Sequence, residues 1–299
     1  MYPLQFVPII KKMVWGSESW DISCRNAPGE MSIIANGELA GEPFDKVIAQ
    51  NSVGWLGTKA SEFYQKNGFP LLVKIIDAKD DLSIQVHPND EYALANGFER
   101  GKSEMWYIMQ AKSDQNLIIG LTDDATPQKL QNAPLDCLNR LPIKKGDMID
   151  IPAGMVHAIT SGVKLAEIQQ NCDVTFRLYD YNRLGLDGLP RQLHIKDGIA
   201  VSDFANKFPK TAVKNGVVQN QYFSVVKREI KKGINSNITQ KTNPKTFFIL
   251  TCVEGSFTVL YENYSLELPC GRSVFIPPSC GSFAITGTGV FLESSVATG

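Results

Sequence analysis

Two side chains that can bind a metal ion lie two residues apart in a short apolar run. Gln85 and His87 alternate with Ile84 and Val86, and alternation along a β-strand directs every second side chain to the same face. An amide and an imidazole would therefore share one surface. The pair alone does not decide between a metal site and a solvated strand face, because polar alternation is typical of both.

Two further candidate ligands lie downstream, each in or beside another strand-like run. Glu104 lies in the segment 101–106, and His157 follows the segment 151–156, which contains a Pro-Ala-Gly turn. Two imidazoles, a carboxylate and an amide oxygen suit zinc, although glutamine is an unusual zinc ligand and a harder ion stays open. The residues thus predict one divalent cation per chain and no organic cofactor, with these ligands: Gln85, His87, Glu104 and His157.

The elements that would position these ligands are mostly short strands. The apolar, β-branched and aromatic runs are separated by Gly, Pro, Asn and Asp, as is typical of strands and turns. Examples are 71–76, 105–109, 247–250 and 273–276. Helical patterns are few, at about 60–67, 89–98 and 126–133. This balance favours a closed antiparallel barrel over an alternating α/β sheet.

A faint internal repeat predicts a second barrel. Residues 146–152 align with 271–277, and 106–109 align with 247–250. In this alignment Ser282 takes the place of His157 and Lys245 that of Glu104, so the second copy has lost its ligands. The strand pattern lapses near 206–220. We therefore expect a metal-binding catalytic domain over 1–205 and a degenerate, metal-free barrel over 206–299.

Charge and hydropathy exclude several partners. The net charge is −1 with no basic cluster, whereas binding to a nucleic-acid backbone needs a clustered excess of Lys and Arg. No apolar run approaches the roughly 18 residues that span a bilayer, and the first residues lack the pattern of a signal peptide. The six cysteines form no Cys-x-x-Cys pair, which fits reduced thiols. We expect a cytoplasmic protein that binds neither nucleic acid nor membrane.

Several segments in a fixed order give the chain a family resemblance. They are Trp15-Gly16 with 18–23, 74–78, 82–90, 101–107, 151–157, 167–173 and 191–194. In this order the chain resembles the type I phosphomannose isomerases, which are cupin proteins. The resemblance covers residues 1–200 well, and the rest only as a weak barrel-like pattern. It implies two cupin-type antiparallel jelly-roll barrels, the second degenerate, with a few short helices.

The resemblance also implies roles for individual residues. The four candidate ligands match the metal-binding positions of the family. Asp173 and Arg177 match its Asp-x-x-x-Arg spacing, in which the arginine is catalytic, and Lys102 matches a lysine that precedes the metal-binding glutamate. The chain departs from the family at Ser103, where proline is usual. His194 lies in a family-like segment, where a supporting role is expected rather than ligation.

The odd-numbered residues between Leu165 and Arg177 are expected to share one face of an extended strand. Their polar side chains are also typical of a solvated outer face. The resemblance favours an inward face instead, on which the Arg177 guanidinium would stabilise developing negative charge in a dry cavity.

The activity that the resemblance implies is the interconversion of mannose 6-phosphate and fructose 6-phosphate. Such an isomerase takes the C2 proton of an open-chain aldose and returns it at C1 through an enediolate. The base stays open between Lys102, Asp173 and a further residue, and Arg100, Arg183 and Arg191 are only loose candidates for binding phosphate. Two alternatives remain: a cupin oxygenase with a redox metal, and a non-catalytic sugar-phosphate sensor. The sequence leaves the oligomeric state unknown.

Overall fold

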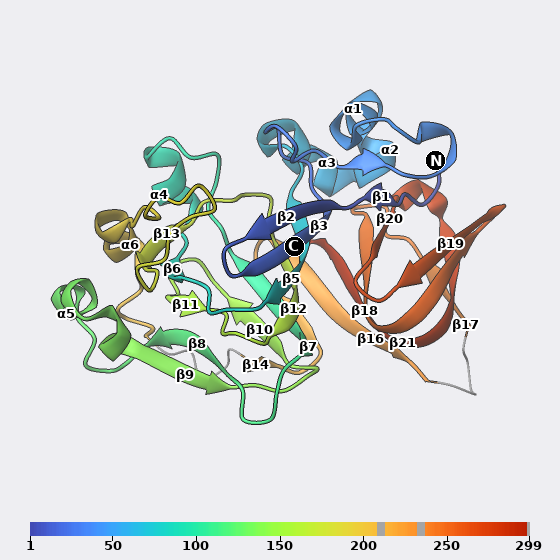
Figure 1. Cartoon of the computed structure of the whole chain (residues 1–299). Coiled ribbons are helices and arrows are strands. Elements are labelled where there is room, and N and C mark those ends of the chain that lie inside the picture. Colours follow the sequence, from blue (N-terminus) through green and yellow to red (C-terminus); the bar gives the residue numbers. More distant parts are fainter. Residues whose placement is uncertain (208–212, 232–236, 298–299) are drawn as a thin grey trace. The chain divides into compact units, whose positions relative to one another are not determined.

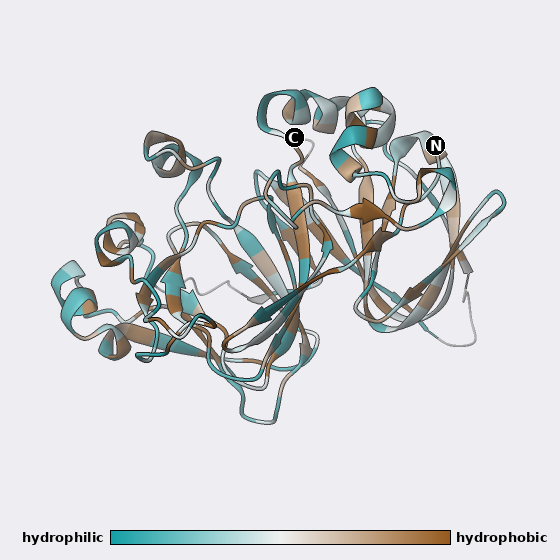
Figure 2. Ribbon diagram, turned by 45° about the horizontal axis from the view of Figure 1, so that its top comes forward, coloured by the Kyte–Doolittle hydropathy of each residue, from teal (hydrophilic) through white to brown (hydrophobic). Residues whose placement is uncertain are grey.

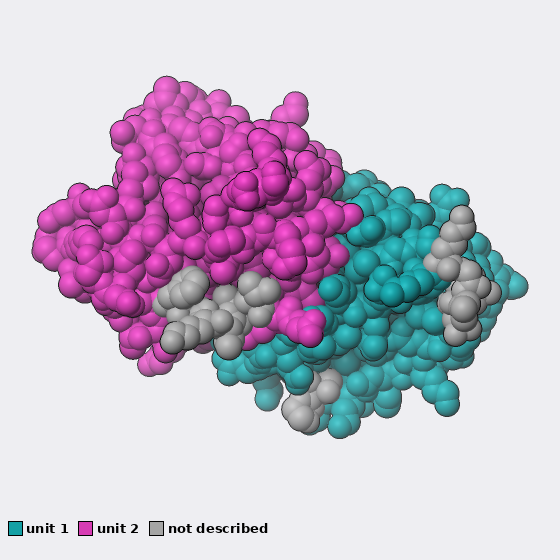
Figure 3. Space-filling model, turned by 90° about the horizontal axis from the view of Figure 1, so that it is seen from below, with its two compact units in different colours: residues 1–9, 19–74, 216–299 teal, residues 10–18, 75–215 magenta. Residues whose placement is uncertain are grey.

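The computed structural model describes residues 1–207, 213–231 and 237–297. The chain forms two compact units, each assembled from separate stretches of sequence (Figure 3). Unit 1 contains Met1–Ile9, Ser19–Lys74 and Gly216–Gly299, and unit 2 contains Ile10–Glu18 and Ile75–Asn215. All four candidate metal ligands belong to unit 2.

These compact units differ from the two consecutive segments expected from the sequence. Residues 1–9 and 19–74 group with the carboxy-terminal strands rather than with the candidate site. The division into folding domains 1–205 and 206–299 therefore stays a prediction. The expected link at 206–220 lies partly outside the described residues, and its described part contains the short strands β14 (Val213–Lys214) and β15 (Val217–Gln219).

Two antiparallel sheets carry the candidate site (Figure 1). The seven-stranded sheet has the order β14-β10-β7-β12-β5-β3-β2, and the five-stranded sheet has the order β13-β6-β11-β8-β9. The bounds in the first sheet are β10 Met148–Ile151, β7 Glu104–Gln110, β12 Lys164–Gln170, β5 Leu71–Ala78, β3 Gly16–Ile22 and β2 Ile9–Met13. Those in the second are β13 Phe176–Tyr179, β6 Ile84–Val86, β11 His157–Ala158, β8 Asn116–Leu121 and β9 Leu138–Pro142.

A shared apolar core joins these two sheets. Trp106 and Ile149 of the first sheet belong to the same buried cluster as Leu117 and Ile119 of the second. Bulky β-branched and aromatic side chains fill a pleated surface well, which favours strands at these positions. The mainly β, antiparallel architecture expected from the sequence is confirmed, and the candidate ligands lie on the sheets that enclose this core.

Unit 1 contains its own antiparallel sheet and an aromatic core. Its sheet has the order β15-β16-β21-β18-β19, with β17 paired to β21 and β20 to β18. The bounds are β16 Phe223–Ile230, β21 Ser282–Val296, β18 Phe248–Tyr261, β19 Tyr264–Pro269, β17 Asn237–Lys241 and β20 Ser273–Ile276, with a small pair of β1 Phe6–Val7 and β4 Ile33–Ile34. Rings from three sequence regions meet in this core: Phe6, Phe44, Phe69, Phe247 and Phe275.

The three expected helices are present, and three more were missed. The expected ones are α3 (Thr58–Asn67), α4 (Asp90–Ala95) and α5 (Pro127–Asn132). The Asn89 and Thr126 side chains cap α4 and α5 by accepting from backbone N–H groups. The missed helices are α1 (Phe44–Gln50), α2 (Ser52–Leu56) and α6 (Ile195–Val201). Unlike α4 and α5, helices α1 and α6 begin without a side-chain cap.

Strand pairing corrects the alignment of the internal repeat. In unit 2, Ile149 of β10 pairs with Trp106 of β7. In unit 1, Val274 of β20, which aligns with Ile149, pairs with Leu250 of β18. Trp106 therefore corresponds to Leu250, three residues later than the sequence alignment placed it. By the same register Phe248, not Lys245, takes the place of Glu104, and an apolar ring cannot ligate a metal.

Apolar and hydrophilic residues alternate along many strands, and hydrophilic residues are frequent in the loops (Figure 2). Among the described residues, no helix is long and apolar enough to cross a bilayer.

Candidate metal centre and active site

The candidate ligands come from both sheets of unit 2. Gln85 on β6 and His157 on β11 are register partners, so their side chains lie on the same face of the five-stranded sheet. Glu104 begins β7 of the other sheet. His87 directly follows β6, and its backbone carbonyl accepts from Gly154 N–H at 2.9 Å. Gly154 has φ +87°, which suits glycine in this tight turn.

Three donor atoms converge at the centre. The ligand atoms of His87, Glu104 and His157 all lie within 4.8 Å of one another. His87 Nε2 lies 3.5 Å from Glu104 Oε2, and His157 Nε2 lies 3.4 Å from Glu104 Oε1. The three side chains are 0–1% exposed. This is the only such group of His, Cys, Asp or Glu side chains within the part of the chain that the structure describes.

Backbone carbonyls orient both imidazoles for ligation. His87 Nδ1 lies 2.9 Å from the Val174 carbonyl, and His157 Nδ1 lies 2.8 Å from the Met155 carbonyl. A carbonyl accepts only, so each Nδ1 must carry the proton and donate it. Each Nε2 then presents a lone pair towards Glu104, which is the arrangement that a metal ion requires of histidine ligands.

Burial keeps His157 in its neutral, ligating form. Removal from water lowers the pKa of His157 to about 4, with an opposing contribution from its bond to the Met155 carbonyl. The positive charge of Lys102 lowers this pKa further. At neutral pH His157 is therefore a lone-pair donor rather than a cation.

Gln85 completes the ring of polar side chains around the centre. Its amide nitrogen lies 3.3 Å from His157 Nε2, and its amide oxygen accepts from the Ser83 hydroxyl at 3.3 Å. A half-turn of the amide exchanges these two atoms at nearly the same positions. His87, Glu104 and His157 already direct their ligand atoms at one point. Gln85 would direct its amide oxygen there after a 180° rotation of its amide group.

Lys102 and Glu167 extend the polar cluster. Lys102 Nζ lies 2.9 Å from Glu104 Oε2 and 3.7 Å from Glu167 Oε1, with its side chain 5% exposed. Trp106 Nε1 donates to Glu167 Oε2 at 3.2 Å. A cation between two buried carboxylates offsets their charge and places a proton-carrying group beside the metal ligands.

Arg177 lies in the same row as two of the candidate ligands. On β13 it pairs with Gln85, which in turn pairs with His157, so the three side chains follow one another across three strands. Burial lowers the pKa of Arg177, and the nearby Arg191 lowers it further. Arg177 still carries its charge at neutral pH, because a guanidinium does not deprotonate in proteins.

Comparison with known proteins gives a consistent result over the whole chain. A family model for the type I phosphomannose isomerase catalytic domain matches residues 7–125, and one for the mannose-6-phosphate isomerase cupin domain matches 214–296. A probable mannose-6-phosphate isomerase of Bacillus subtilis is 33% identical over 98% of this chain and 99% of its own length. The chain belongs to the type I phosphomannose isomerase family.

Another family member and a solved structure agree with this. The mannose-6-phosphate isomerase of Streptococcus mutans is 33% identical over 90% of this chain and 85% of its own length. The crystal structure of the mannose 6-phosphate isomerase from Bacillus subtilis has a TM-score of 0.84 at 29% identity, covering 98% of this chain and 99% of that chain. The resemblance seen in the sequence is thereby confirmed.

The departure from the family at Ser103 has a structural counterpart. Ser103 N–H donates to Gln170 Oε1 at 2.8 Å, and its hydroxyl accepts from Ala153 N–H at 3.2 Å. Proline could make neither bond, because it has no N–H and no hydroxyl. These bonds fix the backbone directly before Glu104, so the departure leaves this ligand in place.

The predicted single strand from 165 to 177 is wrong. The chain leaves one sheet after β12 and enters the other at β13, so 171–175 form a connection between the two sheets. Glu167 and Gln169 are buried, which supports the inward face, but Asp173 lies in the connection and is exposed. Asp173 is therefore not brought into the buried cluster that contains Lys102, although its charge acts on Arg177.

Sequence reasoning assigned no individual role to two residues that organise this region of the family fold. Glu167 contacts both Lys102 and Trp106, and Asp180 accepts from Arg183 at 2.6 Å and from Arg191 at 2.7 Å. Glu167 is one of the odd-numbered residues expected on the inward face, but strand alternation alone does not indicate its partners. Nothing local marks Asp180, because its partners depend on how the loop after β13 folds back.

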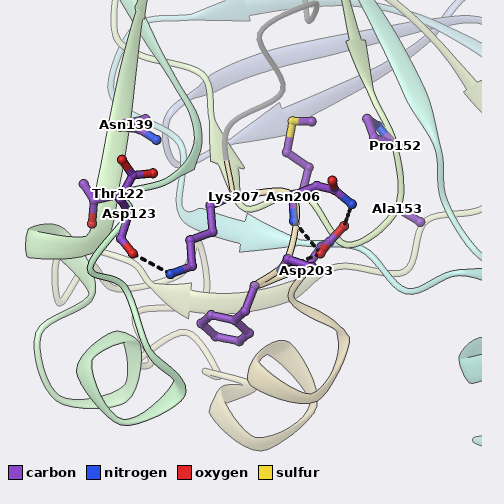
Figure 4. A pocket seen from close by; sticks show the side chains of 11 residues that line it. Thr122, Asp123, Asn139, Pro152, Ala153, Asp203, Asn206 and Lys207 are labelled. Carbon is purple, nitrogen blue, oxygen red and sulfur yellow. Dashed lines mark hydrogen bonds between the residues drawn. The ribbon is translucent and has the colours of Figure 1, made fainter.

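One remaining prediction concerns His194. His194 Nδ1 accepts from Arg177 N–H at 3.2 Å, which is the supporting role expected of it. A hollow of about 1070 Å³ lies elsewhere in unit 2 (Figure 4). There Lys207 Nζ donates to the Asp123 carbonyl at 2.6 Å, and Asp203 accepts from Asn206. None of the predicted site residues lines this hollow, so we assign it no part in the chemistry.

Proposed function

We propose that this chain is a metal-dependent aldose–ketose isomerase that interconverts mannose 6-phosphate and fructose 6-phosphate. The observation that carries the proposal is the convergence of His87, Glu104 and His157 beside Lys102 in a buried cluster. The relatives named as mannose-6-phosphate isomerases match this chain over nearly its full length, which supports the choice of substrate.

We propose zinc as the ion, held by Gln85, His87, Glu104 and His157. Neutral imidazoles and a carboxylate fit zinc well, and the site is too dry to suit an ion that keeps most of its water. When bound, the ion would polarise the sugar oxygens and orient the reacting end of the substrate. The remaining roles fall to the side chains around it.

Lys102 is the residue best placed to carry the proton between C2 and C1. It is buried, lies 2.9 Å from Glu104 and has a second carboxylate, that of Glu167, at 3.7 Å. Asp173, the other candidate, is exposed. A general acid–base group works within hydrogen-bond reach of the reacting atom, so burial next to the ligands favours Lys102.

We further propose that Arg177 stabilises the enediolate. Its partner in register, Gln85, contacts His157 at the centre, so the guanidinium projects from the same row. A preorganised cation in a water-poor site acts most strongly where charge develops in the transition state. The planar fork of arginine can donate twice to an oxyanion, which a lysine cannot do in a fixed geometry.

A coupled assay with mannose 6-phosphate tests this function. The purified protein should form fructose 6-phosphate, lose activity when a chelator removes the metal, and regain it with added zinc. A sensor would bind the sugar phosphate without turnover, and an oxygenase would consume oxygen and need redox-active iron. Either result would refute the proposal.

We propose that the protein is localised in the cytoplasm. The six cysteines form no disulfide in the structure, and five of them are at least partly buried. Reduced thiols fit a reducing compartment. Fractionation of growing cells, followed by detection of the protein with an antibody, would test this localisation.

A further inference from the structure

A second cavity lies beside Arg177 and has two guanidinium groups in its wall. It encloses about 540 Å³ within unit 2. Its lining includes Arg177, Arg191 and Gln192 together with apolar side chains such as Leu186 and Leu189. A concave site with a few polar groups in an apolar wall is typical of small-molecule binding.

The loop that carries Arg191 runs antiparallel to β13. His194 N–H donates to the Arg177 carbonyl at 2.7 Å, and Arg191 contacts Asp180 at 2.7 Å. Asp180 lies three residues after Arg177, and Arg191 lies three residues before His194, as expected of two antiparallel segments. At about 3.3 Å per residue, Arg191 lies roughly 10 Å along the strand from Arg177. Of the two arginines in the cavity wall, Arg177 is the one that pairs in register with the candidate ligand Gln85, and Arg191 lies farther along β13.

A buried carboxylate holds Arg191 in place. Asp180 is 3% exposed and accepts from Arg191 through one oxygen and from Arg183 through the other. Arg183 also contacts the exposed Asp80 at 3.4 Å and does not line the cavity. Asp180 thus fixes the direction of the Arg191 fork and leaves its remaining N–H donors for another acceptor.

The cations of the cavity outweigh the anions in its wall. Arg177 and Arg191 are close enough for the second to lower the pKa of the first, which reports repulsion between like charges. Asp187 is the one carboxylate in the lining, and it accepts from Leu189 N–H at 3.0 Å. A dianion bound at Arg191 would offset this excess of positive charge.

We propose that Arg191 binds the phosphate of the substrate and so sets the preference for a 6-phosphorylated hexose. The inference rests on the proposed function. A phosphomonoester carries close to two negative charges and presents three acceptor oxygens, which match the bidentate fork of arginine. The substrate has its reacting carbons at one end and its phosphate on C6 at the other. The arrangement of Arg177 near the centre and Arg191 farther along follows the same order.

Steady-state kinetics with mannose 6-phosphate and with unphosphorylated mannose test this role of Arg191. Arg191→Ala should raise KM for mannose 6-phosphate about 10- to 100-fold, which is the loss of affinity expected when one charge-assisted hydrogen-bonded pair is removed. Its kcat should change much less, because phosphate binding is equally strong in ground and transition states. The kcat/KM for unphosphorylated mannose should stay the same. Arg140→Ala, which removes an exposed arginine from the same unit, should change none of these values.

Direct titration separates this inference from the proposed function. Calorimetry with inorganic phosphate and the metal-loaded protein should show binding to the wild type that weakens at least tenfold in Arg191→Ala. Arg191→Lys keeps a charge beside Asp180 but lacks the fork, so it should fold normally and give an intermediate loss.

The outcomes are distinct. A wild type that isomerises mannose 6-phosphate, with Arg191 variants that bind phosphate and substrate as well as it does, overturns the inference and leaves the function standing. A wild type without isomerase activity, but with phosphate binding that is lost in Arg191→Ala, overturns the function and supports the inference. An equal loss for mannose and mannose 6-phosphate would make Arg191 a structural residue and contradict its role.

Discussion

Lys102 Nζ lies 2.9 Å from Glu104 Oε2, in a cluster where neither side chain is more than 5% exposed. Because Glu104 is also a candidate metal ligand, one carboxylate links the ion to the group that would carry the proton. If both proposed roles hold, ion binding and proton transfer would be coupled through Glu104. When a carboxylate binds a metal ion, the ion offsets part of its negative charge, and its attraction for a neighbouring lysine ammonium becomes weaker.

Replacing Lys102 separates catalysis from metal binding. Lys102→Met keeps much of the apolar length but removes the charge, and it should lower kcat about 100- to 10,000-fold, the usual contribution of a general acid–base group. Metal content should stay at one ion per chain, measured by atomic emission. Lys112→Met, at an exposed lysine of the same unit, is the control. Wild-type turnover in Lys102→Met would exclude this residue as the proton carrier.

Arg177→Ala should lower kcat about 100- to 1000-fold, the cost of losing one preorganised oxyanion donor. KM should change less than kcat, because the interaction strengthens mainly in the transition state. Metal content should not change. Steady-state kinetics and metal analysis check this, and an unchanged kcat would remove Arg177 from the mechanism.

An isotope experiment tests the enediolate itself. Mannose 6-phosphate labelled with deuterium at C2 should lose part of its label to solvent during turnover, because a proton held on a side chain can exchange. Mass spectrometry of the fructose 6-phosphate measures the loss. Complete transfer of the label to C1 under all conditions would indicate a hydride shift instead.

The low pKa of His157 predicts how the metal-free protein responds to acid. In the folded protein the pKa of His157 is about 4, below the usual 6.5 of a histidine in an unfolded chain. Between pH 4 and 6.5 the unfolded chain therefore binds more protons than the folded protein. Stability should then fall as the pH drops from about 6.5 to 4, with a slope of up to about 1.4 kcal/mol per pH unit. Urea unfolding of chelated protein measures this. His157→Gln should show a shallower dependence, and an identical one would contradict the prediction.

The carboxy-terminal strands should be needed for folding rather than for chemistry. In unit 1 Phe275 packs against Phe44 and Phe69 from the amino-terminal segment. Truncation near residue 210 would expose these rings to water and reduce solubility. Light scattering and dye binding check this, with the full chain as control. A soluble, fully active fragment ending there would show that the second barrel is dispensable.

Three of the four predicted ligands, His87, Glu104 and His157, converge in the structure, whereas several elements around them were not predicted. Gln85, His87, Glu104 and His157 lie in strands or strand ends, where the two-residue period determines which side chains share a face. The connection 171–175 escaped prediction because polar alternation continues through it, although the chain changes sheets. Arg191 was named as a loose phosphate candidate, but its contact with Asp180 was not predicted, because it depends on a loop that folds back along β13.

The repeat shows a related limit. Apolar strands of similar composition align almost equally well in several registers, so the sequence alignment placed Lys245 opposite Glu104. Hydrogen-bonded pairing fixes a single register and moves the correspondence by three residues. The expectation of a metal-free second barrel does not depend on that choice, since Phe248 is no better a ligand than Lys245.

Stoichiometric reconstitution tests the central claim most directly. Zinc added to the chelated wild-type protein, with mannose 6-phosphate turnover measured at each step, should restore activity in proportion and reach a plateau at one ion per chain. Replacing both His87 and His157 by alanine should abolish tight zinc binding and activity together while the β-rich circular dichroism spectrum persists. Full activity without metal, or one tightly bound zinc per chain in the double variant, would contradict the account.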